Sequence, residues 1–265
     1  MKIPLLICIT ILLAFTNCQA KVKPNLEIAK ENSSENYIEL SAEFLESIIN
    51  DKPSKEIQNK LETVSIKTLS NQLTTDIKKK VFWINIYNAY IQLLLNEHPE
   101  LYEDRGEFFK KNRITIAGEA LSFDKIEHGI IRSSKIKLSL GLLRNPFVGK
   151  YERTFRTKNT DPRIHFALNC GAKSCPLVAV YRVENFDSKI DAVAADFLIK
   201  TTSFNQEKNT VAATSLFSWF RGDFGGKQGI IQFLQQYDQI PTSSTPDLNF
   251  TTYDWTLSLN NYYNE

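Results

Sequence analysis

The segment DPRIHFALNCGAKSCPLV, residues 161–178, concentrates the side chains of this chain that could do chemistry. His165, Cys170 and Cys175 lie within eleven residues of one another, although the chain has only three histidines and four cysteines. The other two cysteines lie in the apolar N-terminal stretch. These residue types at this spacing are compatible with a disulfide, a metal site or thiol catalysis.

Two interpretations of the cysteines are structural. A disulfide between Cys170 and Cys175 is natural in an exported protein and would close a short loop. Zinc could be held by the two cysteines with His165 and His128, but the spacing is not that of a standard zinc finger or ribbon. We assign no metal and expect no cofactor.

The third interpretation is a nucleophilic cysteine with a histidine as general base and an oxygen-bearing group that orients the histidine. A loop glycine and a proline beside these cysteines would leave backbone N–H groups free to favour a thiolate. Inert thiols remain a fourth alternative. The candidate catalytic residues are Cys170, Cys175, His165, His128 and Glu127, with Asn169 or Asp161 as alternative orienting groups.

His128 belongs to the segment FDKIEHGIIR, for which Ser122 is a suitable helix cap. Glu127 precedes the histidine, and Arg132 follows four residues later on the same helical face. A carboxylate and an arginine beside a histidine could tune it as a base. An ordinary solvated helix face has the same residues, so both interpretations stay open.

The run RIHFALN alternates between apolar and polar residues, which predicts a half-buried strand over Ile164–Leu168. Such a strand would place Arg163, His165 and Asn169 side by side on one polar face.

The run VFWINIYNAYIQLLLN is apolar almost all round, yet Asn85, Asn88 and Gln92 fall on one helical face. Buried amides without partners cost about 1–3 kcal/mol each, so this stripe must meet hydrogen-bonding groups. It is either a structural network or the wall of a polar cleft. The candidate ligand-binding residues are Asn85, Asn88, Arg163, Asn169 and Trp83. We predict that this stripe, Glu127-His128 and the 163–175 segment converge around one pocket.

The elements that must position these residues are mainly helical. The apolar periodicity predicts helices over residues 37–49, 57–73 and 76–96, a helix at 123–132, and further helices at 188–200, 216–220 and 230–237. Short strands are expected near 114–116, 164–168, 210–212 and 247–254. The fold class is therefore α+β, a predominantly helical single domain with a small β-sheet.

The N-terminal stretch MKIPLLICITILLAFTNCQA predicts an export signal, because a lysine precedes an apolar run too short to span a bilayer comfortably. LLAFTNC resembles a loose lipobox, so Cys18 is the candidate lipidation site of a bacterial lipoprotein. Ordinary signal cleavage, which would leave Lys21 first, and an uncleaved anchor are the alternatives.

The expected organisation is therefore a signal peptide at 1–17, a polar linker at 18–36 and one globular domain at 37–265. We expect an exported protein that is lipid-anchored to the bacterial cell envelope, or else periplasmic or secreted. Membrane attachment is expected only through the N-terminal lipid anchor.

The composition excludes one class of partner. Basic and acidic residues nearly balance, 32 against 30, and form no long basic run, so nucleic acid is not an expected partner. The expected ligand is an unidentified small molecule, peptide or glycan.

Several motifs together resemble the domain of unknown function 547 family. These are FWINIYNA, IEHGIIR, DPRIHFALNCGAKSCP, LFSWFRGDFGG and YDWTLSLN, and the resemblance covers residues 37–260. Leu177 departs from the pattern, since a second proline is common there in the family. The family lacks a settled activity, so the resemblance implies a domain but no reaction. The resemblance also weakens the interpretation that Cys170 and Cys175 serve only as a structural disulfide, because many relatives are intracellular.

Two hypotheses of function follow. The first is a cysteine-dependent hydrolase or acyltransferase using the Cys/His set above. The second is a non-catalytic binding or scaffold module of the cell envelope, with Trp83, Trp219 and the 223–226 turn lining a recognition cleft for a peptide, glycan or protein.

Overall fold

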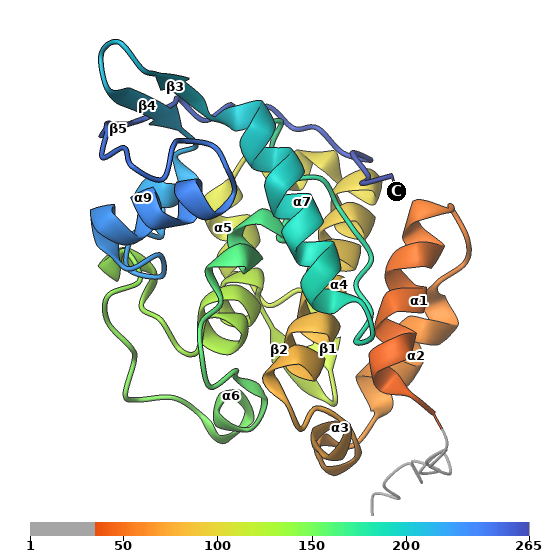
Figure 1. Cartoon of the computed structure of the whole chain (residues 1–265). Coiled ribbons are helices and arrows are strands. Elements are labelled where there is room, and N and C mark those ends of the chain that lie inside the picture. Colours follow the sequence, from red (N-terminus) through yellow and green to blue (C-terminus); the bar gives the residue numbers. More distant parts are fainter. Residues whose placement is uncertain (1–34, 265) are drawn as a thin grey trace, which may run out of the picture. The chain divides into compact units, whose positions relative to one another are not determined.

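The computed structural model describes residues 35–264 (Figure 1). The predicted α+β class, mainly helical with little sheet, is confirmed. The α-helices are α1 (Tyr37–Ile49), α2 (Lys55–Thr63), α3 (Ile66–Gln72), α4 (Asp76–Glu97), α5 (Arg105–Lys110), α6 (Lys150–Phe155), α7 (Phe186–Thr201), α8 (Leu216–Trp219) and α9 (Gly226–Gln236). Other helical turns are η1 (Pro99–Tyr102), η2 (Lys125–Ile131, a π-helix), η3 (Lys137–Ser139) and η4 (Pro162–Phe166).

The first core is built around α4, which packs mainly against α1. Both helices begin where the sequence supplies a cap: the side chain of Asn36 accepts from the backbone N–H groups of Ile38 and Glu39, and Thr75 accepts from Lys78. The long central part of α4 is buried on every face, as expected for a helix that is apolar all round. Its bounds agree with the predicted 76–96 helix to one residue.

The strands form two separate small sheets. β1 (Ile114–Ile116) pairs antiparallel with β2 (Glu119–Leu121). β3 (Ser203–Asn205) pairs antiparallel with β4 (Thr210–Ala213), which pairs parallel with β5 (Asp247–Phe250), Val211 lying opposite Leu248. In Figure 1 the three-stranded sheet lies at the top, near α7 and α9, away from the β1–β2 hairpin.

A second core surrounds α7, α8, α9 and β4, and includes Phe166, Phe217 and Phe233. The turn η4 lies between the two cores, because Ile164 belongs to the first and Phe166 to the second. A histidine between them, His165, is therefore fixed at the boundary of both cores.

The predicted strand at 164–168 is wrong: Pro162–Phe166 is a 3-10 helix, whose first turn is capped by the side chain of Asp161 accepting from the Arg163 N–H. The alternation arose because successive apolar residues enter two different cores instead of one face of a sheet. Consequently the predicted row of Arg163, His165 and Asn169 on a strand face does not exist.

Two further predictions need correction or restriction. The single helix expected at 57–73 is two helices, α2 and α3, broken at Val64-Ser65, where the Ser65 hydroxyl accepts from the Thr68 N–H. The signal peptide, the lipidation at Cys18 and most of the linker lie outside the described residues. Among the helices described, none combines the length and apolar character needed to cross a membrane.

Candidate functional site

The candidate site is a cavity of about 400 Å³ where the two cores meet. Four of the five candidate catalytic residues line it: Glu127, His128, His165 and Cys170. The rest of its lining is mainly apolar and aromatic, with Asp124, Lys137, Tyr87 and Tyr253 as the other polar residues. A larger groove of about 930 Å³ near α1 and α2 has no histidine or cysteine among its lining residues, so we place the chemistry in the smaller cavity.

His165 is paired with an aspartate that follows it by 58 residues. Its Nε2 lies 2.9 Å from Oδ2 of Asp223, whose side chain is fully buried. The imidazole also stacks on Phe220, with ring centroids 3.8 Å apart and planes 12° from parallel. These two contacts fix both the position and the rotation of the ring.

Burial and the charge of Arg132 determine the protonation states of His165 and Asp223. Burial alone would raise the pKa of Asp223, but the hydrogen bond from His165 and the Arg132 guanidinium hold that pKa below its usual value. Burial lowers the pKa of His165, and Arg132 lowers it further, against the attraction of Asp223. A neutral imidazole therefore donates its Nε2–H to an ionised carboxylate, and its Nδ1 keeps a free lone pair.

Arg132 connects the two histidines. Its Nε donates to Asp223 Oδ2 over 2.7 Å, its Nη1 lies 2.7 Å from His128 Nδ1, and its guanidinium carbon lies 4.5 Å from the centre of the Phe220 ring. A guanidinium can only donate, so His128 Nδ1 must accept, and the proton of a neutral His128 is on Nε2.

His128 is therefore a poor general base. Burial, followed by the positive charge of Arg132, lowers the pKa of His128 to about 3. Its Nε2–H is a hydrogen-bond donor, and the nearest carboxylate oxygen to Nε2, Asp124 Oδ1, is 3.6 Å away. Of the two interpretations left open for this segment, one had Arg132 tuning His128 as a base; in the structure Arg132 contacts His128, and its charge suppresses protonation of the imidazole.

Glu127 is the second acid–base group of the cavity. Burial raises the pKa of its carboxyl, against the opposing effect of Arg132. The Tyr87 hydroxyl lies 3.5 Å from Glu127 Oε2, and Oε1 lies 3.4 Å from His128 Nδ1. A buried carboxyl with a raised pKa can hold a proton near neutral pH and act as a general acid.

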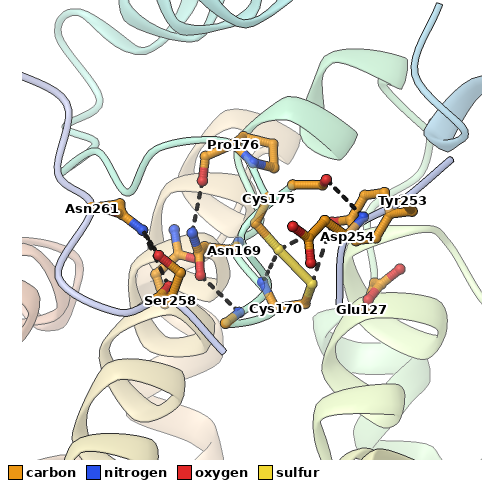
Figure 2. The surroundings of a disulfide bond; sticks show 12 residues. Glu127, Asn169, Cys170, Cys175, Pro176, Tyr253, Asp254, Ser258 and Asn261 are labelled. Atoms are coloured by element: carbon orange, nitrogen blue, oxygen red, sulfur yellow. Dashed lines mark hydrogen bonds between the residues drawn. A yellow bond between two sulfur atoms is a disulfide. The ribbon is translucent and has the colours of Figure 1, made fainter. Parts of the chain in front are cut away.

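The two cysteines form a disulfide, so neither is a free thiol in this structure. Only Cys170 lines the cavity, whereas Cys175 lines a different pocket of about 350 Å³. Figure 2 shows the disulfide with Glu127 and Tyr253 on one side and Asn169 on the other. The Tyr253 hydroxyl lies 3.2 Å from Cys175 Sγ and 3.5 Å from Cys170 Sγ, and the Cys170 N–H donates to Cys175 Sγ over 3.0 Å.

The amide stripe of α4 is a structural network that holds the segments of the site. The Asn85 side chain donates to the Tyr181 carbonyl over 2.8 Å and accepts from the Tyr181 N–H over 3.0 Å. Asn88 binds the chain just before Cys170 in the same way, through the Ala167 carbonyl and the Asn169 N–H. Gln92 accepts from the backbone N–H of Asn260. Neither asparagine lines the cavity.

Three other predicted ligand-binding residues also lie outside the cavity lining. Trp83 is fully buried in the first core, edge-on to neighbouring aromatic rings. Arg163 forms ion pairs with Asp161 and the α7 carboxylates Asp187 and Asp191. Asn169 shapes the cysteine loop instead, since its side chain donates to the Pro176 carbonyl and accepts from the Gly171 N–H.

Sequence reasoning missed several residues of the site. Asp223 was expected in a recognition turn, not as the partner of a histidine. It lies 58 residues from His165, so no local sequence pattern could predict that the two side chains pair. Tyr253 and Trp255 were not predicted, and they form one aromatic wall of the cavity with Trp219, which the binding hypothesis had already placed in a cleft; the two tryptophan rings are 5.5 Å apart and nearly parallel. The motifs YDW and LFSWF were the available signals, because they carry these rings beside polar residues.

No group of three or more His, Cys, Asp or Glu side chains within residues 35–264 is arranged to hold a metal ion. A family model described as "Protein of unknown function, DUF547" matches residues 71–198. The matched segment contains Glu127, His128, His165 and both cysteines of the disulfide, while Asp223 and Tyr253 lie beyond it. The chain matches no curated protein and no solved structure.

Proposed function

We propose, from the cavity itself, that the protein is a cysteine-dependent hydrolase or acyltransferase, because the family whose model matches residues 71–198 has a description that names no activity. Cys170 is the nucleophile, His165 the general base, and Asp223 the group that orients His165. The observation that carries the proposal is the Asp223–His165 pair, which leaves Nδ1 of His165 unprotonated, together with the fact that His165 and Cys170 line the same cavity.

The first step frees the nucleophile. A dithiol donor reduces the Cys170–Cys175 disulfide to two thiols and is itself oxidised to a disulfide. His165 Nδ1 then takes the proton of the Cys170 thiol, and the thiolate attacks the carbonyl carbon of an ester or amide. The alcohol or amine leaves with the proton from His165. Water, or an acceptor alcohol or amine, displaces the resulting thioester and regenerates the thiol.

The other polar groups suit the charge that develops in this reaction. The carbonyl oxygen becomes negative, and both the Nε2–H of His128 and the hydroxyl of Tyr253 are donors on the cavity lining. Burial raises the pKa of Tyr253, so its hydroxyl keeps its proton. The aromatic and aliphatic lining favours an acyl or aromatic group on the substrate.

The second candidate function is a binding module, and one observation favours it: the disulfide is formed, which leaves no thiol for catalysis. In this alternative the cavity holds an apolar or aromatic ligand, and Glu127 and His128 fix its polar end. The disulfide and Tyr253 then only brace the cavity wall.

The test uses the full chain and its Cys175→Ser variant, in which no Cys170–Cys175 disulfide can form. A p-nitrophenyl ester of a short fatty acid is the acyl donor, and mass spectrometry maps the acylated residue. We expect Cys170 of the variant to be acylated without reductant, and Cys170 of the wild type only after a dithiol is added. Adding His165→Gln to the variant should slow acylation by about 10²–10⁴-fold, the usual range for a lost general base.

The surface histidine offers the matched control: His98→Gln, combined with Cys175→Ser, should leave the rate unchanged, since His98 is exposed. If Cys170 stays unmodified in every folded variant, the thiol mechanism is excluded. Binding of 1-anilinonaphthalene-8-sulfonate that is equal in the oxidised and reduced wild type would then favour the binding module.

Export to the cell envelope, with a lipid on Cys18, also remains a proposal. The apolar stretch and the cysteine at its end support it, and the intact disulfide suits an oxidising compartment. Mass spectrometry of the N-terminal peptide from cells would test it, because a lipid on Cys18 and a new terminus at Lys21 have different masses.

A further inference from the structure

The connection between η2 and α6 exposes an unusual number of large apolar side chains. We define the apolar loop as residues 136–147. Its side chains are among the most exposed large hydrophobic groups of the described residues, with Leu138 92% and Phe147 91% accessible. The others are Ile136, Leu140, Leu142 and Leu143. A single exposed apolar side chain is ordinary, but six large ones in one loop mark an interaction surface.

Hydrogen bonds fix the backbone of the apolar loop, so its side chains are exposed in a defined conformation. The Ile136 N–H donates to the Leu143 carbonyl over 2.9 Å, and Lys135 pairs with Arg144 as an isolated antiparallel bridge. The Gly222 N–H donates to the Leu140 carbonyl over 2.7 Å, which ties the loop to the turn that carries Asp223. In Figure 1 the loop is the long green trace that leads into α6. The side chains are therefore presented outward by a loop whose base is hydrogen-bonded.

The sequence of the loop and its flanks is mainly basic. Residues 135–158 contain seven basic residues and a single acidic one, Glu152, which is buried and accepts a hydrogen bond from Ser134. Two of the basic residues, Lys135 and Lys137, face Asp223 and Asp124. Four basic side chains have no carboxylate partner among the described residues: Arg144, Lys150, Arg153 and Lys158. All four residues are exposed.

We propose that the apolar loop docks on an anionic lipid bilayer, with its leucines and Phe147 in the boundary of the acyl chains and the four cations at the headgroups. Apolar tips flanked by unpaired Lys and Arg are the combination that binds a membrane surface without spanning it. A protein partner would need carboxylates facing the cations and would not need so many extended aliphatic tips. This contact is additional to a lipid on Cys18, and it would fix which face of the domain meets the membrane.

The loop also reaches the cavity, because Leu138 and Leu140 belong to both. Docking would bring this wall of the cavity to the membrane surface, where molecules with acyl chains are concentrated. The docking itself does not rest on the proposed catalytic function, and its test measures no activity.

The experiment reports on the loop and not on the N-terminus, which is also apolar. In the full chain, Phe147→Trp places an indole at the loop, and Ile199→Trp places one on α7, where Ile199 is 68% exposed. Each is mixed with vesicles of phosphatidylcholine alone or of an equimolar mixture with phosphatidylglycerol. The difference spectrum against the wild type removes the signal of the native tryptophans. We expect the Phe147→Trp emission to move to shorter wavelength on the anionic vesicles and to be quenched by brominated acyl chains.

The control indole at position 199 should show neither change. Adding Arg144→Glu and Lys150→Glu to Phe147→Trp should weaken the response to anionic vesicles, by about fivefold for each charge neutralised and more for reversal. If the indole at position 147 stays water-exposed on vesicles that bind the protein, the loop does not dock on lipid and the proposal fails. A response equal on neutral and anionic vesicles would exclude the role given to the cations.

Discussion

The most direct test of the site's electrostatics is the variant His128→Asn. His128 is 8% exposed, and burial together with Arg132 lowers the pKa of its imidazole from 6.5 to about 3. The folded chain therefore keeps His128 neutral in a pH range where the unfolded chain protonates it. Because the unfolded state binds the extra proton below pH 6.5, lowering the pH must destabilise the fold until the native pKa is reached.

The magnitude follows from the two pKa values. One pH unit between them corresponds to about 1.4 kcal/mol, so His128 should remove about 2 kcal/mol of unfolding free energy between pH 7 and pH 5. His165 also has a lowered pKa and adds a loss of the same sign. The comparison must therefore be between variants rather than between pH values alone.

Asparagine removes the titrating group and keeps an acceptor for Arg132, since its Oδ1 takes the place of the imidazole Nδ1. Urea unfolding followed by near-UV circular dichroism at pH 7, 6 and 5 gives the free energies. We expect His128→Asn to be less stable than the wild type at pH 7, but to lose about 2 kcal/mol less on going to pH 5. The exposed His98→Asn should keep the wild-type slope. Parallel slopes for the wild type and His128→Asn would refute a neutral, buried His128.

Two further predictions concern the frame around the cavity. Asn88→Ala should cost about 2–4 kcal/mol in urea unfolding, because it strands one buried carbonyl and one buried N–H just before Cys170; a cost below 1 kcal/mol would mean that water replaces the amide. Gly141→Ala should destabilise the fold more than Gly118→Ala does. Both glycines have positive φ, but an added Cβ at Gly141 lies 2.5 Å from Asp223 Oδ1, while at Gly118 nothing lies within 4 Å. Equal costs would show that the loop yields without disturbing Asp223.

The elements that the sequence predicted well are those whose ends are fixed locally. The bounds of α1 coincide with the predicted residues 37–49, and Ser122 bonds the Lys125 N–H at the start of the segment that carries His128. Side-chain caps and helical periodicity depend only on residues close together in the sequence, so a single sequence is enough to predict them.

The errors arose where two distant parts of the fold act on one segment. Alternation around His165 predicted a strand, but it reflects two cores on either side of a short turn, which no local pattern distinguishes from a sheet face. The sequence brought Glu127, His128, His165 and Cys170 together as scarce reactive types. It could not identify Asp223 as the partner of His165, nor show that Arg132 keeps His128 neutral, because both depend on the direction of side chains from separate segments.

The amide stripe of α4 has a consequence for how the site tolerates a change of charge. Asn85, Asn88 and Gln92 hold their backbone segments through carboxamides, which neither gain nor lose protons in the range where proteins fold. The histidines and carboxylates of the site line the cavity or contact its lining, whereas these three supporting side chains are uncharged at every pH at which the protein is folded. A proton that arrives at His165 or leaves Glu127 therefore changes the charge inside the cavity, while the hydrogen bonds from these three amides to the backbone keep the same donors and acceptors.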